Sequence, residues 1–336
     1  MSDTTIGHCA RISHFHKVMP VTIESLLREA ETLISRFESE LLLSDAIEKP
    51  RTFVLAHPEY HLSQKEVAQF KSHIVRRTKR EPVAYIVGHK EFYGREFLVN
   101  EHTLIPRPET ELLIEAVLQY TSDVRHIAGK TIHQKHASIL IVDIGTGSGN
   151  IITTLAKELA TCANSTEDFS FIATDISEDA LAVAKNNANR WHTQQTIQFI
   201  HSNLLENIPK EKFFIAKEII IIANLPYLST QEFLDAPIDV RQFEPRSALE
   251  SRTDGLDHYR RLLEELRDIF KEHKKNEKAT LFLEISPSQE TSVQTCIRAI
   301  FPKAKITIFR DLAQKHRLVK ISLNASEKIM GLKKEK

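Results

Sequence analysis

The stretch SILIVDIGTGSGN, residues 138–150, joins an apolar run to a glycine-rich loop. The apolar run has the continuous hydrophobicity of a strand that is buried on both faces of a parallel sheet. A helical pattern, IITTLAKELA, begins directly after the loop at Ile151. Glycines allow the chain to turn sharply where a strand ends and allow a ligand to approach the backbone closely. The stretch therefore predicts a strand, a ligand-binding loop and a helix, in that order.

Strand-like and helix-like patterns alternate through the rest of the chain. The strand-like runs are 139–145, 171–176, 197–203, 218–226, 279–285 and 306–311. The helix-like runs are 151–160, 177–191 and 258–273. Alternation of this kind is typical of an α/β domain with a doubly wound, mostly parallel sheet. Ligands of such sheets bind outside the carboxyl ends of the strands.

The glycine loop distinguishes two classes of cofactor. The nicotinamide fingerprint G-x-G-x-x-G would need glycine at position 150, where the chain has Asn150. The loop instead reads D-x-G-x-G-x-G from Asp143, as in methyltransferases that use S-adenosylmethionine (SAM). Its exposed amides and the helix N-terminus can accept the carboxylate of that ligand, although a tight turn without a ligand is the alternative. The loop residues assigned to the cofactor are Gly145, Thr146, Gly147, Ser148 and Gly149.

Two further positions extend the predicted cofactor site. The second strand pattern ends in Asp175, at the spacing where an acidic residue meets a ribose and accepts both of its hydroxyls. Ser177 is predicted to cap the next helix, which leaves Asp175 free for a ligand. Asn203 ends the third strand pattern, where the edge of the adenine would be read. Turn formation is the alternative for Asn203.

The fourth strand pattern ends in Asn224-Leu225-Pro226-Tyr227, beside the expected cofactor loop. Asn224 offers a side-chain carbonyl and Leu225 a backbone carbonyl that Pro226 helps to hold, and together they can accept both hydrogens of an NH2 group. The ring of Tyr227 can pack on the flat face of an amide or a base. The alternative is a strand end followed by a proline turn, but the DxGxGxG loop and the acidic second strand favour the clamp.

The chemistry of the target explains such a clamp. An amide or aryl nitrogen is a poor nucleophile because its lone pair is delocalised. Carbonyl oxygens on both N–H bonds draw the nitrogen toward sp3 geometry and aim the lone pair at the sulfonium methyl group, by positioning and transition-state electrostatics. The two motifs therefore predict a SAM-dependent methyltransferase that acts on a planar amide or amino nitrogen.

Changes in pattern along the chain predict its domains. A polar leader, expected to be mobile, covers residues 1–20 and a charged, solvated tail covers 324–336. Between them we expect a helical substrate-recognition domain at 21–82, a β-hairpin linker at 83–106 and the methyltransferase domain at 107–323. The helical domain is predicted from a capping box, Ser63 to Glu66, and from apolar residues at helical spacing. These apolar residues are Leu26, Leu27, Ala30, Leu33 and Ile34.

The composition limits the other functions that the chain can have. Its 336 residues suit two domains, and 45 Lys and Arg balance 45 Asp and Glu, so no overall charge favours nucleic acid or an anionic membrane. Three separated cysteines without a C-x-x-C pair predict neither disulfides nor a cysteine-based zinc site, and we expect no metal. No apolar run is long enough to span a bilayer. We expect a cytoplasmic protein.

Several stretches together resemble one family. They are REPVAYIVGHKEFYGREFLV (80–99), LIPRPETELL (104–113), VDIGTGSGNI (142–151), ATDISEDALAVAKNNA (173–188), VRQFEPRSALESRTDGLDHYRRLLEE (240–265), LFLEIS (281–286) and FRDLAQKHRLVKI (309–321). On these residues the chain is similar to the peptide chain release factor glutamine N5-methyltransferases, over nearly the whole of 26–321. The FEPRSAL…DGLDHYRRLL part is the most specific, since general methyltransferases lack it.

The resemblance implies a Rossmann-like class I methyltransferase domain that methylates the glutamine of the release factors' Gly-Gly-Gln loop. By position, the glycine loop and Asp175 would hold the cofactor, and Asn203 and Leu204 would flank its adenine. Asn224, which also borders the cofactor, would clamp the glutamine amide with the three residues after it. The helical domain would help to grip the release factor. We expect a monomer whose partner is the release factor and not nucleic acid.

Two positions depart from the family pattern. The family has N-P-P-Y, where this chain has Leu225 in place of the first proline. A backbone carbonyl survives that change, but the rigidity of the proline is lost. The adenine position is more often acidic than Asn203, although an amide oxygen can still accept from the adenine amino group.

Three alternatives stay open from the sequence. The N-L-P-Y variant also occurs in enzymes that methylate adenine N6 in ribosomal RNA. One alternative is therefore an adenine-N6 methyltransferase acting on RNA or DNA, and Lys71–Arg80 would be its candidate basic patch. A ribosomal-protein glutamine methyltransferase would share every catalytic residue. A cofactor-binding module without activity would have no need of the amide clamp. We expect Glu109, Arg241 and Arg246 to brace the domain and not to touch substrate.

Overall fold

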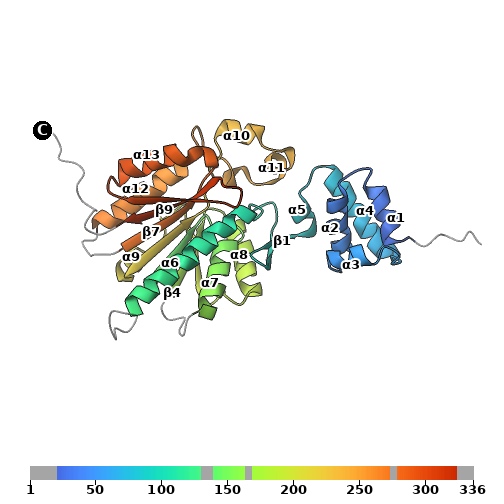
Figure 1. Cartoon of the computed structure of the whole chain (residues 1–336), viewed down its shortest axis with the longest axis horizontal. Coiled ribbons are helices and arrows are strands. Elements are labelled where there is room, and N and C mark those ends of the chain that lie inside the picture. Colours follow the sequence, from blue (N-terminus) through green and yellow to red (C-terminus); the bar gives the residue numbers. More distant parts are fainter. Residues whose placement is uncertain (1–20, 130–138, 163–168, 273–277, 324–336) are drawn as a thin grey trace, which may run out of the picture. The chain divides into compact units, whose positions relative to one another are not determined.

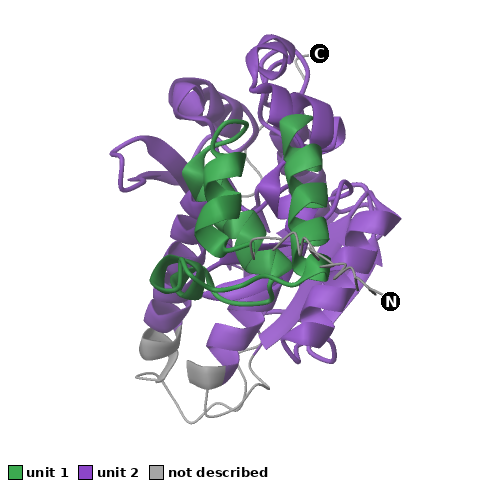
Figure 2. Cartoon of the chain, turned by 90° about the vertical axis from the view of Figure 1, so that its right-hand side faces the viewer, with its two compact units in different colours: residues 1–79 green, residues 80–336 purple. Residues whose placement is uncertain are grey.

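The computed structural model describes residues 21–129, 139–162, 169–272 and 278–323, so the predicted leader and charged tail lie outside the described residues. The chain divides into two compact units, residues 1–79 and residues 80–336, which Figure 2 shows in different colours. Within the described residues, no helix is both long and apolar enough to cross a membrane.

Short helices make up the described part of the first unit. They are α1 (Ile23–Ala30), α2 (Arg36–Ala46), α3 (Arg51–Ala56) and α4 (Gln64–Thr78). Reciprocal capping boxes begin α1, α2 and α4, and the last of these is the predicted pair of Ser63 and Glu66. The predicted helical spacing of apolar residues is wrong at its C-terminal end, because α1 stops at Ala30 and Leu33 is 60% exposed. The extended backbone of Ser35, which caps α2, requires the chain to leave the helix before it.

The second unit begins with a segment that only partly matches the predicted hairpin. A one-turn helix, α5 (Val83–Val87), precedes the antiparallel pair β1 (His89–Phe92) and β2 (Arg95–Leu98). Pro82 stands at the N-cap of α5, and Gly88 ends it in the left-handed conformation with a φ of 80°. Both residues are typical helix boundaries, so these two residues favour a helix even though the segment is rich in β-formers.

A seven-stranded sheet forms the centre of the second unit. Its strands are β3 (Ile139–Ile144), β4 (Phe169–Asp175), β5 (Ile197–His201), β6 (Glu218–Ala223), β7 (Lys278–Glu284), β8 (Lys305–Arg310) and β9 (His316–Leu323). The strand order is β5-β4-β3-β6-β7-β9-β8. The first five strands in this order are parallel to one another, and β9 is antiparallel to both of its neighbours. This confirms the predicted doubly wound, mostly parallel sheet. Strand β9 was missed as a separate strand.

Helices cover both faces of this sheet (Figure 1). One apolar cluster packs α12 (Asp257–Glu272) and α13 (Glu290–Ile300) against the sheet, and the other packs α6 (Glu111–Gly129) and α7 (Asn150–Cys162) against its opposite face. Alternate residues of β3 and β6 belong to the two clusters, as expected for strands that are buried on both faces. The remaining helices are α8 (Glu178–Arg190), α9 (Lys210–Ile215), α10 (Thr230–Asp235) and α11 (Ile238–Phe243), with 3-10 turns η1 (Pro108–Thr110), η3 (Arg246–Ala248) and η4 (Pro287–Gln289).

The strand order places a binding crevice at one point of the sheet. After β3 the chain adds β4 and β5 on one side, and it then returns to add β6 and β7 on the other side. The loops after β3 and β6 therefore diverge at the topological switch point, where doubly wound sheets bind their ligands. The two predicted motifs follow β3 and β6.

Candidate active site

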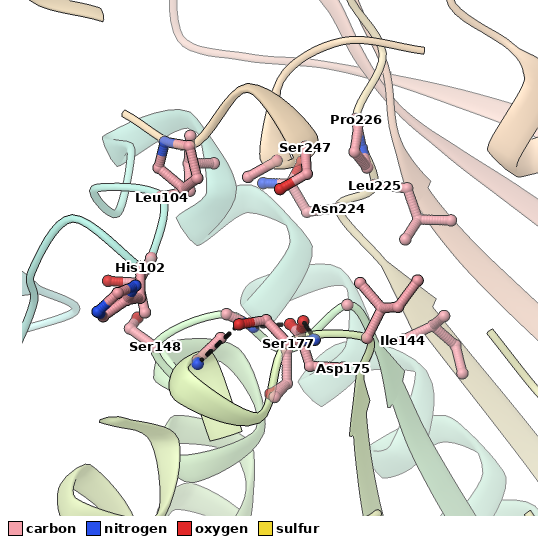
Figure 3. A pocket seen from close by; sticks show the side chains of 18 of the residues that line it. His102, Leu104, Ile144, Ser148, Asp175, Ser177, Asn224, Leu225, Pro226 and Ser247 are labelled. Atoms are coloured by element: carbon pink, nitrogen blue, oxygen red, sulfur yellow. Dashed lines mark hydrogen bonds between the residues drawn. The ribbon is translucent and has the colours of Figure 1, made fainter. Parts of the chain in front are cut away.

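A single pocket joins the two motifs at the carboxyl ends of β3, β4 and β6 (Figure 3). Its walls also include the segment before α6, the turn of η3 and the start of α12. Gly149 and Tyr227 were predicted as site residues but are not among the residues that line the pocket. The predicted residues that do line it are Gly145, Thr146, Gly147, Ser148, Asp175, Asn203, Leu204, Asn224, Leu225 and Pro226.

Glycine suits the three positions of the loop for different structural reasons. Each has a positive φ, from 55° to 73°, which disfavours a side chain. A Cβ on Gly149 would lie 2.9 Å from the Cβ of Ala184, so this glycine permits the close approach of α8. A Cβ on Gly145 would lie 2.9 Å from Cδ2 of Leu225. Gly147 has no atom within 4 Å of its Cβ position and lines the pocket, so its backbone is open to a ligand.

Asp143, at the end of β3, holds the loop through a hydrogen bond. Its Oδ2 accepts a hydrogen bond of 2.6 Å from Oγ1 of Thr146, whereas Oδ1 has no partner among the described residues. Complete burial raises the pKa of Asp143 to about 7, against the lowering effect of the Thr146 hydrogen bond. The negative charge of Asp175 raises the pKa of Asp143 further.

Asp175 connects the glycine loop to the next helix. Its Oδ2 accepts from the backbone N–H of Gly147 at 2.8 Å, and its Oδ1 accepts from the N–H of Ser177 at 2.9 Å. The Oγ of Ser177 accepts from the N–H of Ala180, so the predicted cap of α8 is confirmed. Burial raises the pKa of Asp175, and the backbone hydrogen bonds act against it. Each carboxylate oxygen has a second lone pair, which leaves acceptor capacity for a ligand.

Asn203 and Leu204 lie on the turn after β5, on the wall next to Asp175. The Nδ2 of Asn203 donates to Glu206 at 3.3 Å, which is the turn contact that the alternative interpretation expects. Leu204 has a φ of 54°, and its carbonyl accepts from Oγ of Ser202 at 3.0 Å. Both residues line the pocket, so their predicted place beside an adenine stays a prediction.

Asn224 is the polar side chain of the second motif, and Figure 3 shows it opposite Asp175 across the pocket, close to Ser247. Its Nδ2 donates a hydrogen bond of 3.2 Å to Oγ1 of Thr110. Thr110 is 2% exposed and ends η1, directly before α6. With its NH2 group turned to Thr110, Asn224 has its carbonyl oxygen available as an acceptor.

The backbone of the second motif is held on both sides. The N–H of Leu225 donates to Oη of Tyr259 at 3.3 Å, and that hydroxyl donates to the carbonyl of Glu284. The carbonyl of Tyr227 accepts from Nε2 of Gln289 at 2.8 Å. A Cβ on Gly255 would lie only 2.1 Å from the same carbonyl oxygen, so only glycine fits there. Leu225 therefore gains, through its N–H, a restraint that the proline of the family pattern could not form.

Tyr227 and Glu284 lie together under this motif. Burial raises the pKa of the Tyr227 hydroxyl, and the negative charge of Glu284 raises it further. Burial likewise raises the pKa of Glu284 to about 7, while hydrogen bonding from Thr110 and Tyr227 and the charge of Arg317 lower it. The hydroxyl of Tyr227 thus lies near the buried carboxyl group, and the predicted packing of its ring on an acceptor stays a prediction.

Sequence reasoning assigned no role in the site to several residues that line this pocket. They are Thr110 on η1, Ser247 and Ala248 on η3, His258 at the start of α12, and Glu101 to Leu104 before η1. The nearest signals for them were the PRPET and FEPRSAL…DGLDHYRRLL stretches, which carried the family resemblance but no assigned chemistry.

The three residues expected to act as braces make the following contacts. Arg241 donates from Nη1 to the carbonyl of Leu234 at 2.6 Å. Arg246 pairs with Glu250 and lies over the ring of Phe233, with its Cζ 4.9 Å from the centroid. Glu109 is not among the pocket-lining residues, and its charge raises the pKa of Glu284. The described residues contain no group of three His, Cys, Asp or Glu side chains arranged for a metal ion.

Comparison with known proteins adds to this geometry. Residues 22–88 match the family model described as the PrmC N-terminal domain, and residues 135–282 match the methyltransferase domain model. The release factor glutamine methyltransferase of Enterococcus faecalis is 35% identical over 268 residues, which cover 80% of this chain and 85% of that protein. The chain belongs to the release factor glutamine methyltransferase family. The predicted resemblance is therefore confirmed.

Further relatives in this family differ in length. The Bacillus subtilis release factor glutamine methyltransferase is 35% identical, with 84% of this chain and 89% of that protein covered. A protein of Rickettsia bellii named bifunctional methyltransferase is 38% identical over 302 residues, covering 86% of this chain but 51% of that relative. The chain thus spans about half the length of the bifunctional relatives that it matches.

Proposed function

We propose that this chain transfers the methyl group of SAM to the side-chain amide nitrogen, N5, of the glutamine in the Gly-Gly-Gln loop of peptide chain release factors. The observation that carries this proposal is the single pocket with two different walls. One wall is the glycine loop with Asp175, and the other is Asn224 with Leu225 and Pro226. The names of the Enterococcus and Bacillus relatives support the release factor as the acceptor.

The wall formed by the glycine loop and Asp175 presents groups that suit the polarity of SAM. Gly147 presents its backbone with no atom near its Cβ position, and Asp175 keeps lone pairs for ribose hydroxyls. Asn203 and Leu204 would flank the adenine, and the N-terminus of α7 would favour the carboxylate. When bound, SAM supplies an electrophilic methyl group on a sulfonium sulfur.

The wall formed by Asn224, Leu225 and Pro226 would hold the acceptor amide. The Oδ1 of Asn224 and the backbone carbonyl of Leu225 would accept one N–H each, with Pro226 and Tyr227 completing the clamp. Both oxygens are fixed before the acceptor arrives, since Thr110 holds the Asn224 side chain and Tyr259 holds the Leu225 backbone. Preorganised acceptors of this kind would stabilise the positive charge that develops on the nitrogen as its lone pair takes the methyl group and the bond from that methyl group to the sulfonium sulfur breaks. One N–H proton is then released to solvent.

The structure of the second motif also bears on the departure from N-P-P-Y. The hydrogen bond from Leu225 to Tyr259 and the packing of Leu225 on Gly145 restrain the position that a proline ring would otherwise restrain. The amide clamp is therefore compatible with leucine at this place. A monomeric state and a cytoplasmic location remain predictions.

The test is methyl transfer from labelled SAM to three acceptors. They are a purified unmethylated release factor, the same factor with the glutamine of its Gly-Gly-Gln loop replaced by alanine, and ribosomal RNA. We expect label on the intact release factor alone. Label on RNA alone would contradict the proposal and would favour the adenine-N6 alternative, while equal labelling of the alanine variant would place the methyl group on another residue.

A further inference from the structure

The pocket has a third wall, which neither of the two motifs supplies. Residues 101–104 line it, and in the view of Figure 3 His102 lies on the same side of the pocket as Ser148 of the glycine loop. This wall begins shortly after Leu98, the last residue of β2. The wall and the glycine loop are distant in the sequence, so their arrangement depends on what joins them.

Asn187 on α8 bonds to both segments. Its Nδ2 donates to the carbonyl of Ser148 at 2.8 Å and to the carbonyl of Leu98 at 2.9 Å. Its Oδ1 accepts from the N–H of Leu98 at 2.7 Å. The residue is 0% exposed. All three partners are backbone groups whose donor or acceptor roles are fixed, so a turned amide would face like groups, and these bonds determine its orientation.

The hairpin offers a free edge for these bonds. β1 and β2 form a sheet of two strands, so β2 has one edge that no strand covers. The amide of Asn187 bonds the N–H and the carbonyl of Leu98, as a neighbouring strand would bond such an edge. The position of Leu98, and with it the start of the wall at residues 101–104, is therefore tied to α8.

The glycine loop packs on the same face of α8. Ala184 precedes Asn187 by three positions on the helix, and a Cβ on Gly149 would lie 2.9 Å from the Cβ of Ala184. Ser148 is 1% exposed, so its carbonyl would be left without a partner at considerable cost if Asn187 did not bond to it. Close packing and a hydrogen bond thus join α8 to the end of the loop.

We propose that Asn187 is a positioning residue that holds the end of β2 and the glycine loop in the arrangement that SAM requires, so that the hairpin is part of the cofactor site. This inference rests on the proposed function through the use of SAM and is independent of the acceptor. Asn187 does not line the pocket and acts through the backbones of Ser148 and Leu98. Without these bonds the unliganded loop can relax, and SAM must restore it at the expense of its binding energy.

A second anchor of the hairpin allows this role to be separated from general stability. The Nε1 of Trp191 donates to the carbonyl of Glu96 at 3.0 Å, and Arg190 donates to the carboxylate of Glu96 at 2.6 Å. These bonds hold the hairpin to the end of α8, but none of the three residues lines the pocket. Trp191→Phe therefore loosens the hairpin without removing a bond to the glycine loop.

The decisive variant is Asn187→Ala, which removes all three bonds. We expect the Kd for SAM, measured by calorimetry on the full chain without acceptor, to rise by about 10- to 100-fold. In methyl transfer to the release factor, KM for SAM should rise by a similar factor, while kcat at saturating SAM changes by less than about threefold. A lower kcat with an unchanged Kd for SAM would contradict the proposal.

Two control variants accompany it. Asn186→Ala changes the same residue type at the neighbouring, exposed position of α8, and it should leave the Kd for SAM unchanged. Trp191→Phe should lower the stability to urea but change the Kd for SAM by less than about threefold. A rise in Kd with Trp191→Phe as large as with Asn187→Ala would show that any loosening of the hairpin has this effect, and it would overturn the proposal.

A measurement on the parent protein needs no variant that could fail to fold. Coupling between two sites is reciprocal, so SAM must also stabilise the bonds that Asn187 makes to β2. Saturating SAM should slow hydrogen exchange of the Leu98 amide by at least about tenfold, as followed by NMR of 15N-labelled protein. Slower exchange in the glycine loop with no change at Leu98 would overturn the proposal.

The failure of this proposal can be told apart from that of the proposed function. A parent protein that binds SAM but methylates no release factor would refute the proposed acceptor, and the Kd values of the variants would still test Asn187. Asn187→Ala that binds SAM as tightly as the parent protein would overturn the role of Asn187 alone. A parent protein that binds no SAM would overturn both.

Discussion

The Cδ2 atom of Leu225 lies 2.9 Å from the point that a Cβ on Gly145 would occupy. The side chain of the second motif therefore packs on the backbone of the first, and the two walls of the pocket are in direct contact. The position of the leucine that departs from the family pattern is thus coupled to the position of the cofactor loop.

Replacing Gly145 by alanine should test this contact. Its φ of 69° costs about 1–2 kcal/mol for a residue with a side chain, and the clash with Leu225 adds to that cost. We expect lower unfolding stability in urea and weaker SAM binding by calorimetry. In the double variant with Leu225→Pro the clash is absent, so the loss should be smaller than the sum of the two single losses. Strict additivity would show that the contact carries no energy.

Replacing Leu225 by proline alone should be tolerated. The proline matches the family pattern and keeps the backbone carbonyl, but it removes the N–H that donates to Tyr259 and the packing on Gly145. We expect kcat for the release factor to change by less than about tenfold, because the acceptor oxygens stay in place. Tyr259→Phe serves as the companion variant. A complete loss of transfer in Leu225→Pro would mean that the leucine itself selects the acceptor.

Gly255 and Gly94 form a matched pair for the second motif. Both have a positive φ, 72° and 69°, but a Cβ on Gly255 would lie 2.1 Å from the Tyr227 carbonyl oxygen while Gly94 has open space. Gly94→Ala should cost only backbone strain, about 1–2 kcal/mol of unfolding free energy. Gly255→Ala should cost more and should also reduce methyl transfer, since it displaces the Tyr227 backbone. Equal losses from urea unfolding of the two variants would contradict the crowding argument.

The pH dependence of stability should reveal Asp143. Its pKa is about 7 in the folded protein and ordinarily 3.8, so the folded state holds the proton more tightly than the unfolded state. Its contribution is therefore fully present below about pH 4 and is lost as the pH rises toward 7, at about 1.4 kcal/mol per pKa unit. Urea unfolding at pH 5 and pH 8 should show a steeper decrease for the parent protein than for Asp143→Asn. Parallel decreases would refute this assignment.

Sequence reasoning identified the parts of the site that are contiguous. The glycine loop and Asn224 to Tyr227 each follow a strand directly, so strand periodicity and a few special residues were sufficient to place them. Thr110 is 114 residues from Asn224, and their contact depends on how α6 begins beside the sheet. No local pattern records such a distance, and the buried carboxyl group of Glu284 was missed for the same reason.

The fold shows the same limit. The parallel core was predicted because most of its strands are continuous apolar runs, while β9 was missed because polar and charged residues interrupt its apolar ones. α5 was hidden inside a segment of β-formers, and the helical repeat was extended four residues too far, to Ile34. For these two helices a boundary residue, Gly88 or Ser35, determined where the helix ends more than the average propensity of the segment did.

The most direct test of the central claim is the Asn224→Ala variant, assayed for methyl transfer and for SAM binding in parallel. We expect transfer to the release factor to be abolished, with kcat falling by at least about 100-fold, while SAM binding stays measurable by calorimetry. Turnover equal to that of the parent protein would contradict the claim that Asn224 holds the acceptor amide.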